Sequence, residues 1–220
     1  MTEAGAELLV DRFRAVVFDM DGLLLDTEIL WHRAEVELFS RRGADFTWDD
    51  KMTVIGTSFA FTADYFADRL GVPHEQGPGL VGEMIELMHG HLREQVESRP
   101  GAFELVERLR GHTRLGLASN SPRALVDTAM ATARIGDAFD AIVTSDDVER
   151  PKPAPDLYLL ACERLGVDPD EALALEDSAS GVTAAKAAGL TCIAVPQFAE
   201  TDVSAADRII DSLEELLAET

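Results

Sequence analysis

One repeating pattern occupies most of this chain and restricts its fold: short, continuously apolar segments alternate with amphipathic helices. The apolar segments, which predict strands, lie at 15–17, 115–118, 141–143, 172–175, 192–195 and near 209. Helices are expected at 102–110, 123–133, 155–165 and 181–188, with a last one reaching 217. Strands that are apolar on both faces and separated by helices are typical of a parallel sheet covered on both sides. The pattern therefore predicts an α/β, Rossmann-like fold.

The segment from 29 to 97 differs, because its apolar residues recur at helical spacing and no strand pattern appears. One helix is expected from Thr27 to about Arg42, and a long one carries apolar residues at positions 81, 85, 88, 92 and 96. Pro73 and the stretch 77–79 should separate that long helix from the preceding one. We therefore predict a Rossmann-like core formed by 1–28 and 98–220, with a small all-helical domain, 29–97, inserted into it.

The composition indicates a stable core and a strongly acidic surface. Apolar residues make up 46% of the 220 residues, and 41 Asp and Glu against 19 Lys and Arg give a net charge of −22. Such a charge repels nucleic acid and anionic membranes, so we expect neither as a partner. No apolar stretch approaches the roughly 20 residues of a membrane span, and the first ten residues do not resemble a signal peptide. Cys162 and Cys192 lack metal-ligand spacing, so we expect reduced thiols and a cytoplasmic location. No feature of the sequence indicates an oligomeric state.

Polar side chains follow each of the first four strands in the expected sheet. Asp19 and Asp21 follow the first, 119–121 (Ser-Asn-Ser) the second, Lys152 lies beyond the third, and 176–177 (Glu-Asp) follow the fourth. In open parallel sheets the working site lies beyond the carboxyl ends of the strands. These residues should therefore meet at one rim.

The first of these groups, Asp19 and Asp21, brings two acids close together. If the strand alternation continued, both side chains could face the same side, and Gly22 would then allow a sharp turn. Two carboxylates about 4 Å apart repel by roughly 4 kcal/mol at an effective dielectric near 20. A hard divalent cation would offset that repulsion. The alternative is a strand that ends in a solvated acidic turn.

Together these residue types suit phosphoryl transfer. An Asp carboxylate can attack phosphorus, and a second acid can protonate the leaving alkoxide and later deprotonate water. A cation, a lysine and a hydroxyl can neutralise the transferring group. Lys152 lies between two prolines and is one of only three lysines, which favours a fixed charge over a solvated loop residue. Taken singly, 119–121 could be a helix N-cap and 176–178 a helix start.

Four segments resemble the haloacid dehalogenase superfamily, in the branch of β-phosphoglucomutase-like enzymes and small-molecule phosphatases. They are FDMDGLLLDTE at 18–28, ASNS at 118–121, RPKPAPD at 150–156 and LEDSASG at 175–181. Together with the helical insert, which would be the family's cap domain, they span nearly the whole chain. The resemblance implies the same fold class: a Rossmann-like parallel sheet with helices on both faces, plus an inserted helical cap.

The resemblance also implies a role for each matching residue. Asp19 would be the nucleophile that forms an aspartyl-phosphate, and Asp21 the general acid and base. Ser119 and Lys152 would bind the transferring phosphoryl group. Mg²⁺ would be held by Asp19, the main-chain carbonyl of Asp21, and Asp177, with Glu176 either a direct ligand or an outer partner. The second acid, Asp21, argues against the superfamily's dehalogenases, because a halide needs no protonation to leave.

The cap departs from the mutase pattern. Mutases carry a histidine where this chain has Trp31, and one helical position is a rotation of about 100°, so His32 does not substitute for it. Where mutases have a cap arginine this chain has Phe59, and no lysine occurs from 52 through 151. These differences favour hydrolysis of a small phosphate ester, with sugar phosphates as the expected class. The alternatives are a β-phosphoglucomutase-type mutase and a non-catalytic phosphate-binding protein.

A few further residues are assigned to substrate binding. Asn120 and Ser121 accompany Ser119, and Arg123 either helps to bind the substrate phosphate or is a surface helix residue. Trp31 and Phe59 are candidates for lining the substrate site, although aromatic residues of this segment can equally form the core of the helical domain.

Overall fold

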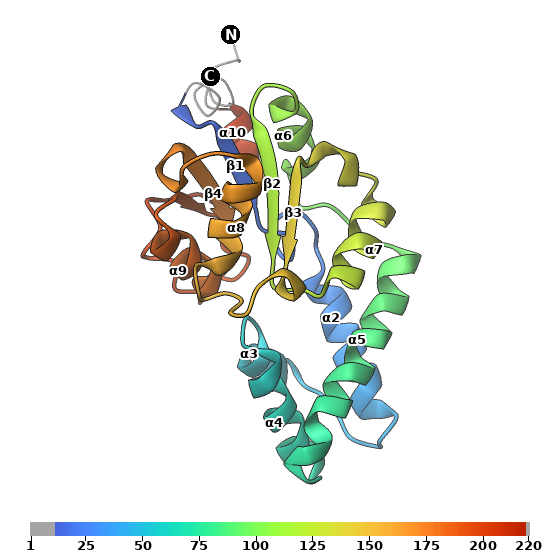
Figure 1. Ribbon diagram of the computed structural model, residues 1–220. Coiled ribbons are helices and arrows are strands. Elements are labelled where there is room, and N and C mark those ends of the chain that lie inside the picture. The colour runs from blue at the N-terminus through green and yellow to red at the C-terminus, as the bar shows by residue number, and fades with distance from the viewer. Residues whose placement is uncertain (1–11, 219–220) are drawn as a thin grey trace. The chain divides into compact units, whose positions relative to one another are not determined.

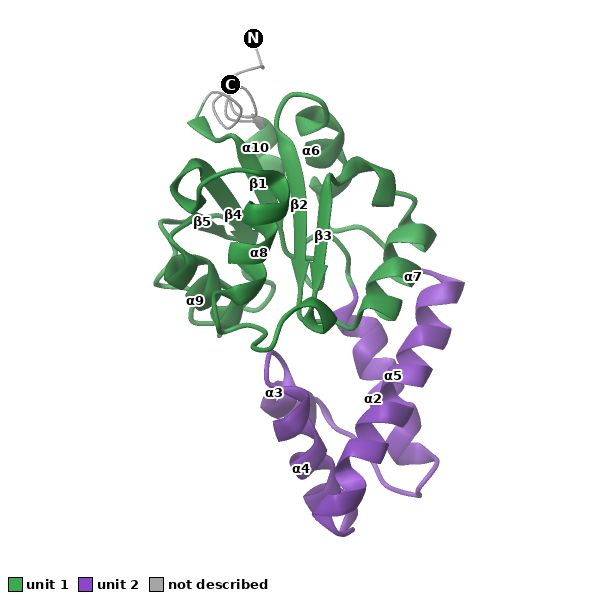
Figure 2. Ribbon diagram, in the orientation of Figure 1, with its two compact units in different colours: residues 1–26, 97–220 green, residues 27–96 purple. Residues whose placement is uncertain are grey.

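The computed structural model describes residues 12–218, which form two compact units (Figure 2). The chain leaves the first unit after Asp26 and returns to it at Glu97; residues 27–96 form the second unit. The prediction that the first ten residues are not a signal peptide concerns residues outside the described part of the chain.

The first unit is built on a parallel sheet of order β3-β2-β1-β4-β5-β6 (Figure 1). All neighbouring strands pair in parallel, with Val17 opposite Gly116 of β2 on one side and Ala174 of β4 on the other. The order steps from β1 outward in both directions, so the carboxyl ends of β1, β2 and β4 lie side by side. The strands are β1 Ala15–Phe18, β2 Arg114–Ser119, β3 Ala141–Thr144, β4 Ala172–Glu176, β5 Thr191–Ala194 and β6 Arg208–Ile209.

Helices cover both faces of this sheet because both faces are apolar. Helix α8 packs on β1, β2 and β3, and α9 packs on β4 and β5, where small residues such as Ala15, Ala118 and Ala174 form a buried cluster with Leu157 and Leu165. Side chains of the opposite parity are equally buried on the other face. The helices of this unit are α6 Ala102–Leu109, α7 Arg123–Ala133, α8 Asp156–Leu165, α9 Ala179–Ala188 and α10 Glu214–Ala218.

The second unit, which we call the helical insert, contains only helices and their connections among its residues 27–96. Its core consists of α2, α4 and α5, with Phe39, Phe46 and Phe66 in mutual edge-on and tilted ring contacts. Asp50 accepts hydrogen bonds from Tyr65 and Arg69 and thereby ties α3 to α4. The helices are α2 Glu28–Ser40, α3 Trp48–Val54, α4 Phe59–Leu70 and α5 Gly77–Glu94.

These observations confirm the predicted fold class: a parallel α/β sheet with helices on both faces, interrupted by an all-helical segment. One detail differs. The sequence predicted that 77–79 would precede the long helix, whereas α5 begins at Gly77, because Pro78 fits the first helical turn, where its missing N–H is not needed. In the part of the chain that the structure describes, no helix has the length and apolar character needed to cross a membrane.

Candidate active site

Four segments meet where the strands of the first unit end, as the sequence predicted. Asp19 follows β1 directly, Ser119 is the last residue of β2, and Glu176 is the last residue of β4. Lys152 lies in the connection between β3 and α8. Glu176 continues the parity of Ala174, and its carboxylate contacts Tyr158 of α8 on the face that this helix covers.

Lys152 joins three of these segments through its ammonium group. Its Nζ lies 2.6 Å from Asp19 Oδ1, 2.6 Å from Glu176 Oε1 and 2.8 Å from the carbonyl oxygen of Ala118. An ammonium has three N–H donors, so all of them are used within the protein. The lysine is thus a buried, fixed charge between two carboxylates, and the alternative of a solvated loop lysine is wrong.

Asn120 holds the main chain of Lys152. The Lys152 N–H donates to Asn120 Oδ1 at 2.9 Å, and Asn120 Nδ2 donates to the Lys152 carbonyl at 3.2 Å. A side-chain amide that accepts from and donates to the same residue fixes both position and direction. Through these two hydrogen bonds, Asn120 holds the main chain from which the Lys152 side chain extends.

Glu176 is fully buried and accepts five hydrogen bonds. Its Oε1 receives Lys152 and the hydroxyl of Tyr158 at 2.7 Å. Its Oε2 receives the N–H groups of Asp177 and Ser178 at 3.1 and 3.3 Å, and the Ser178 hydroxyl at 3.1 Å. Both oxygens are therefore occupied, which agrees better with an outer position than with direct metal coordination.

The sequence analysis gave no role to two residues around Glu176: Tyr158, and Gly181 at the end of the LEDSASG segment. Tyr158 is a fully buried residue of α8, and burial together with Glu176 raises the pKa of its hydroxyl well above its ordinary value, so it stays a donor. A Cβ on Gly181 would lie 1.8 Å from Glu176 Oε1, so only glycine leaves room for that carboxylate. The signal for Tyr158 was its place on an otherwise apolar helix face, because a buried hydroxyl needs a partner.

Asp21 and the two serines form a second group. Ser121 Oγ donates to Asp21 Oδ2 at 2.8 Å and Ser119 Oγ donates to the same oxygen at 3.2 Å. Strand β1 ends at Phe18, so alternation does not set the direction of Asp21, and its carboxylate is turned toward the serines. The N-cap position of α7 belongs to Pro122, which removes the reading of 119–121 as a helix cap. Ser178, in contrast, does cap α9, through the N–H of Gly181.

The charges at this site leave a surplus of carboxylate. Burial raises the pKa of Asp19 well above its ordinary value, and Glu176 and Asp21 raise it further, although Lys152 acts in the opposite direction. Burial also disfavours the charge on Lys152, but Asp19 and Glu176 outweigh that effect and raise its pKa. One lysine is thus set against several acids.

A divalent cation fits this arrangement. One carboxylate oxygen each of Asp19, Glu176 and Asp177 lies within 4.8 Å of the others, and the two oxygens of Glu176 already accept hydrogen bonds, which leaves Asp19 and Asp177 as the direct ligands. Lys152 contacts only Oδ1 of Asp19, which leaves the second oxygen for a ligand bond. Gly22, with φ of +81°, lets Asp177 approach closely, since a Cβ there would lie 2.2 Å from Asp177 Oδ2. Closely spaced carboxylates with excess negative charge suit a hard cation such as Mg²⁺.

The structure does not bring every predicted substrate-binding residue to this group. Arg123 is exposed, its Nε bonds Asp127 at 2.8 Å and its N–H donates to Asp146, which agrees with a surface helix residue. Trp31 and Phe59 belong to the helical insert, where their ring centroids lie 6.1 Å apart. Trp31 is 8% exposed and Phe59 is partly buried, so both contribute to packing within that unit.

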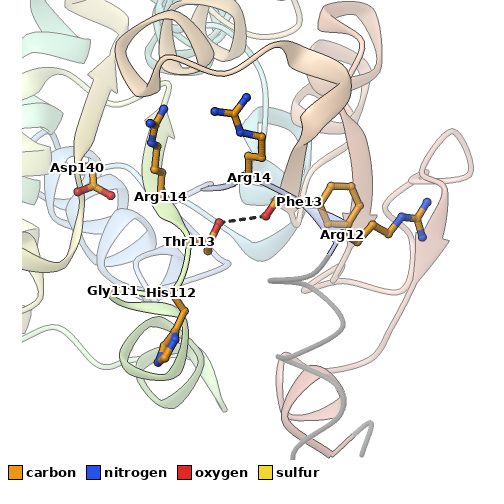
Figure 3. A pocket seen from close by; sticks show the side chains of 8 residues that line it. All are labelled: Arg12, Phe13, Arg14, Gly111, His112, Thr113, Arg114 and Asp140. Atoms are coloured by element: carbon orange, nitrogen blue, oxygen red, sulfur yellow. Dashed lines mark hydrogen bonds between the residues drawn. The ribbon is translucent and has the colours of Figure 1, made fainter.

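A separate pocket lies at the opposite, amino-terminal edge of the sheet (Figure 3). Two of its basic side chains already have partners: Arg14 binds Glu171 at 2.9 Å, and Arg114 donates to the carbonyl oxygens of Leu165 and Gly166. No residue that the sequence predicted for the site lines it. Its lining consists of Arg12, Phe13, Arg14, Gly111, His112, Thr113, Arg114 and Asp140.

Known proteins are similar to this chain in sequence and in fold. The family described as haloacid dehalogenase-like hydrolase matches residues 16–195. Protein CbbY of Cereibacter sphaeroides is 35% identical over 219 residues, which cover 92% of this chain and 93% of that protein. Hexitol phosphatase B of Escherichia coli (strain K12) is 33% identical over 184 residues, with 83% of each chain covered.

A solved crystal structure shares the fold of this chain. The crystal structure of mutant CbbY from Rhodobacter sphaeroides in complex with xylulose-(1,5)bisphosphate superposes with a TM-score of 0.81 at 29% identity, covering 92% of this chain and 96% of that one. The match of the family over most of the chain confirms the resemblance that the four motifs indicated. The chain belongs to the haloacid dehalogenase-like hydrolases, in the small-molecule phosphatase branch of that superfamily, and is a phosphoric monoester hydrolase.

Proposed function

We propose that this protein is a Mg²⁺-dependent phosphatase that hydrolyses a small sugar phosphate through an aspartyl-phosphate at Asp19. The observation that carries the proposal is the group at the strand ends: one buried carboxylate held by a lysine, a second acid two residues on, and an acidic cluster suited to a cation. The relatives support the substrate class, since one is named as a hexitol phosphatase and another was crystallised with a sugar bisphosphate.

The first half of the reaction is transfer of the phosphoryl group to Asp19. A carboxylate oxygen of Asp19 attacks phosphorus, the bond to the ester oxygen breaks, and Asp21 gives its proton to the departing alkoxide. Lys152 keeps Asp19 in place and favours its ionised form, because loss of the ammonium charge would leave two buried carboxylates facing each other. Ser119 turns its hydroxyl from Asp21 to a phosphoryl oxygen.

The second half returns the enzyme to its starting state. Asp21, now ionised, takes a proton from water as that water attacks phosphorus, and the bond between phosphorus and the Asp19 oxygen breaks. Phosphate leaves and Asp19 is again a carboxylate. When bound, Mg²⁺ would neutralise charge on the transferring group; Asp19, Asp177 and the main-chain carbonyl of Asp21 would hold it, with Glu176 as an outer partner.

The mutase alternative gains no support from the helical insert. A mutase must also hold a second phosphate, and Lys51, the one lysine of this unit, is buried and bound to Glu28 at 2.8 Å and Glu35 at 3.4 Å. It is therefore committed to two carboxylates within its own unit.

A phosphate-release assay tests the proposal. Sugar phosphates and nucleotides are supplied with Mg²⁺ or with EDTA, and the wild type is compared with Asp19→Asn and with Asp211→Asn, an exposed control. We expect metal-dependent release from a few sugar phosphates by wild type and control, and none by Asp19→Asn. Conversion of β-glucose 1-phosphate to the 6-phosphate that outpaces release would show a mutase. If the protein shows neither phosphate release nor mutase activity but binds a phosphorylated ligand tightly, it is a non-catalytic binding protein.

A further inference from the structure

Gln197 lies beyond the end of β5 and is held in one orientation. Its Nε2 donates to Asp26 Oδ1 at 3.1 Å. Asp26 is in turn fixed, because its N–H donates to the carbonyl oxygen of Glu97, where the chain returns to the first unit. A flipped amide would set its oxygen against the Asp26 carboxylate, so the hydrogen bond assigns Nε2 to Asp26 and leaves Oε1 at the other end.

The Oε1 atom of Gln197 is buried and has no hydrogen-bond donor among the described residues. Buried amide oxygens in folded proteins are normally paired, so an unpaired one needs an explanation. A donor that the described residues do not supply would come from a water or ligand bound beside it.

The surroundings of Oε1 identify that molecule. A Cβ built on Gly22 would lie 3.0 Å from Gln197 Oε1 and 2.2 Å from Asp177 Oδ2, so the amide oxygen lies beside the carboxylate of the acidic cluster. Mg²⁺ in proteins usually keeps several waters, and water on a cation is a strong donor with two protons to give. A neutral oxygen at the edge of a carboxylate cluster is suited to accept one of them.

We propose that Gln197 is a positioning residue of the divalent-cation site, whose Oε1 accepts a hydrogen bond from a water that the cation retains. The inference rests on the proposed function, since it requires that the cluster of Asp19 and Asp177 binds a cation. It adds a residue from outside the four motif segments. It also links the cation site through Asp26 to the point where the chain leaves the first unit.

Binding of Mn²⁺, followed by electron paramagnetic resonance of the free ion without substrate, tests the inference. The variants are Gln197→Met, which removes the acceptor at similar size, and Gln76→Met, the same change at an exposed position of the helical insert. Outer partners of metal ligands typically affect affinity by 10-fold or more, so we expect Gln197→Met to bind Mn²⁺ about tenfold more weakly and Gln76→Met to bind as the wild type does. Circular dichroism verifies that each variant is folded.

A double variant that exchanges the two side chains distinguishes the role of Gln197 as an acceptor from a purely structural hydrogen bond to Asp26. Asp26→Asn combined with Gln197→Glu keeps the net charge and the hydrogen bond between the two side chains, and still presents an oxygen to the cation. We expect this double variant to recover Mn²⁺ affinity to within about threefold of the wild type. Wild-type affinity in Gln197→Met would overturn the inference alone, as would a double variant no better than Gln197→Met. A wild type that does not bind Mn²⁺ would overturn the metal-dependent function as well.

Discussion

Replacing Gly181 by Ala tests how tightly the buried carboxylate of Glu176 is held. In an ordinary helix this change is stabilising, by at most about 1 kcal/mol, because glycine loses more conformational freedom on folding. In α9 the new methyl carbon would lie 1.8 to 2.1 Å from the carboxyl atoms of Glu176. The carboxylate must therefore move.

The cost of that movement follows from the partners of Glu176. Its displacement leaves the ammonium of Lys152 and the hydroxyl of Tyr158 without a buried acceptor. Breaking a buried ion pair from one side costs about 3–5 kcal/mol, and subtraction of the helix gain leaves a net loss of about 2–4 kcal/mol. For a chain of this size that corresponds to a fall in Tm of roughly 5–15 °C. Because Lys152 also holds Asp19, we expect phosphatase turnover to fall by about 100-fold.

Thermal unfolding followed by circular dichroism measures the effect, with Gly90→Ala as the matched control. Gly90 lies within α5 and a Cβ there would meet nothing within 4 Å, so this variant should be slightly more stable than the wild type. Equal stability and activity of Gly181→Ala and Gly90→Ala would contradict this expectation, because they would show that Glu176 can move without loss.

Three further outcomes follow from the described contacts. Asp19→Asn should lose at least about 10⁴-fold in phosphate release while keeping the wild-type circular dichroism spectrum, and activity near that of the wild type would rule out the nucleophile. Asn120→Ala should lower the free energy of unfolding by about 1–3 kcal/mol and reduce turnover, since it leaves the main chain of Lys152 without its partners; unchanged turnover would contradict a positioning role. Burial, aided by Glu28 and opposed by Lys51, raises the pKa of Glu35 from 4.5 to about 7, so this residue takes up a proton on folding between those values. Its contribution to stability is therefore greatest below pH 4.5 and is lost as the pH rises through 7, by up to about 3 kcal/mol. Glu35→Gln should accordingly be more stable than the wild type at pH 8 in urea unfolding, with a flatter profile from pH 5 to 7; lower stability at pH 8 would contradict this.

The sheet could be predicted from the sequence because its strands are buried on both faces. Continuous apolar runs at 115–118 and 172–175 have few other structural solutions, and the helix at 123–133 begins and ends where its pattern indicated. Where local rules compete, the prediction was less accurate. Pro78 was read as a helix breaker, although it is also favourable in a first turn.

The site could be predicted as a set of residues but not as a set of contacts. Topology places the ends of neighbouring strands together, which is sufficient to gather Asp19, Ser119 and Glu176. It does not say that Asp21 turns to the serines, because alternation stops where β1 ends. The pairing of Lys152 and Tyr158 with one oxygen of Glu176 depends on side chains from distant segments, and no local pattern records it.

Trapping the phosphoryl group on Asp19 during turnover is the decisive test of the proposed reaction. The enzyme is mixed with a sugar phosphate that it hydrolyses, quenched in acid during turnover, reduced with borohydride and digested for mass spectrometry. An acyl-phosphate is reduced to an alcohol, so we expect homoserine at position 19 in the wild type only when substrate is present. Turnover with an unmodified Asp19, or with the modification on another carboxylate, would contradict it.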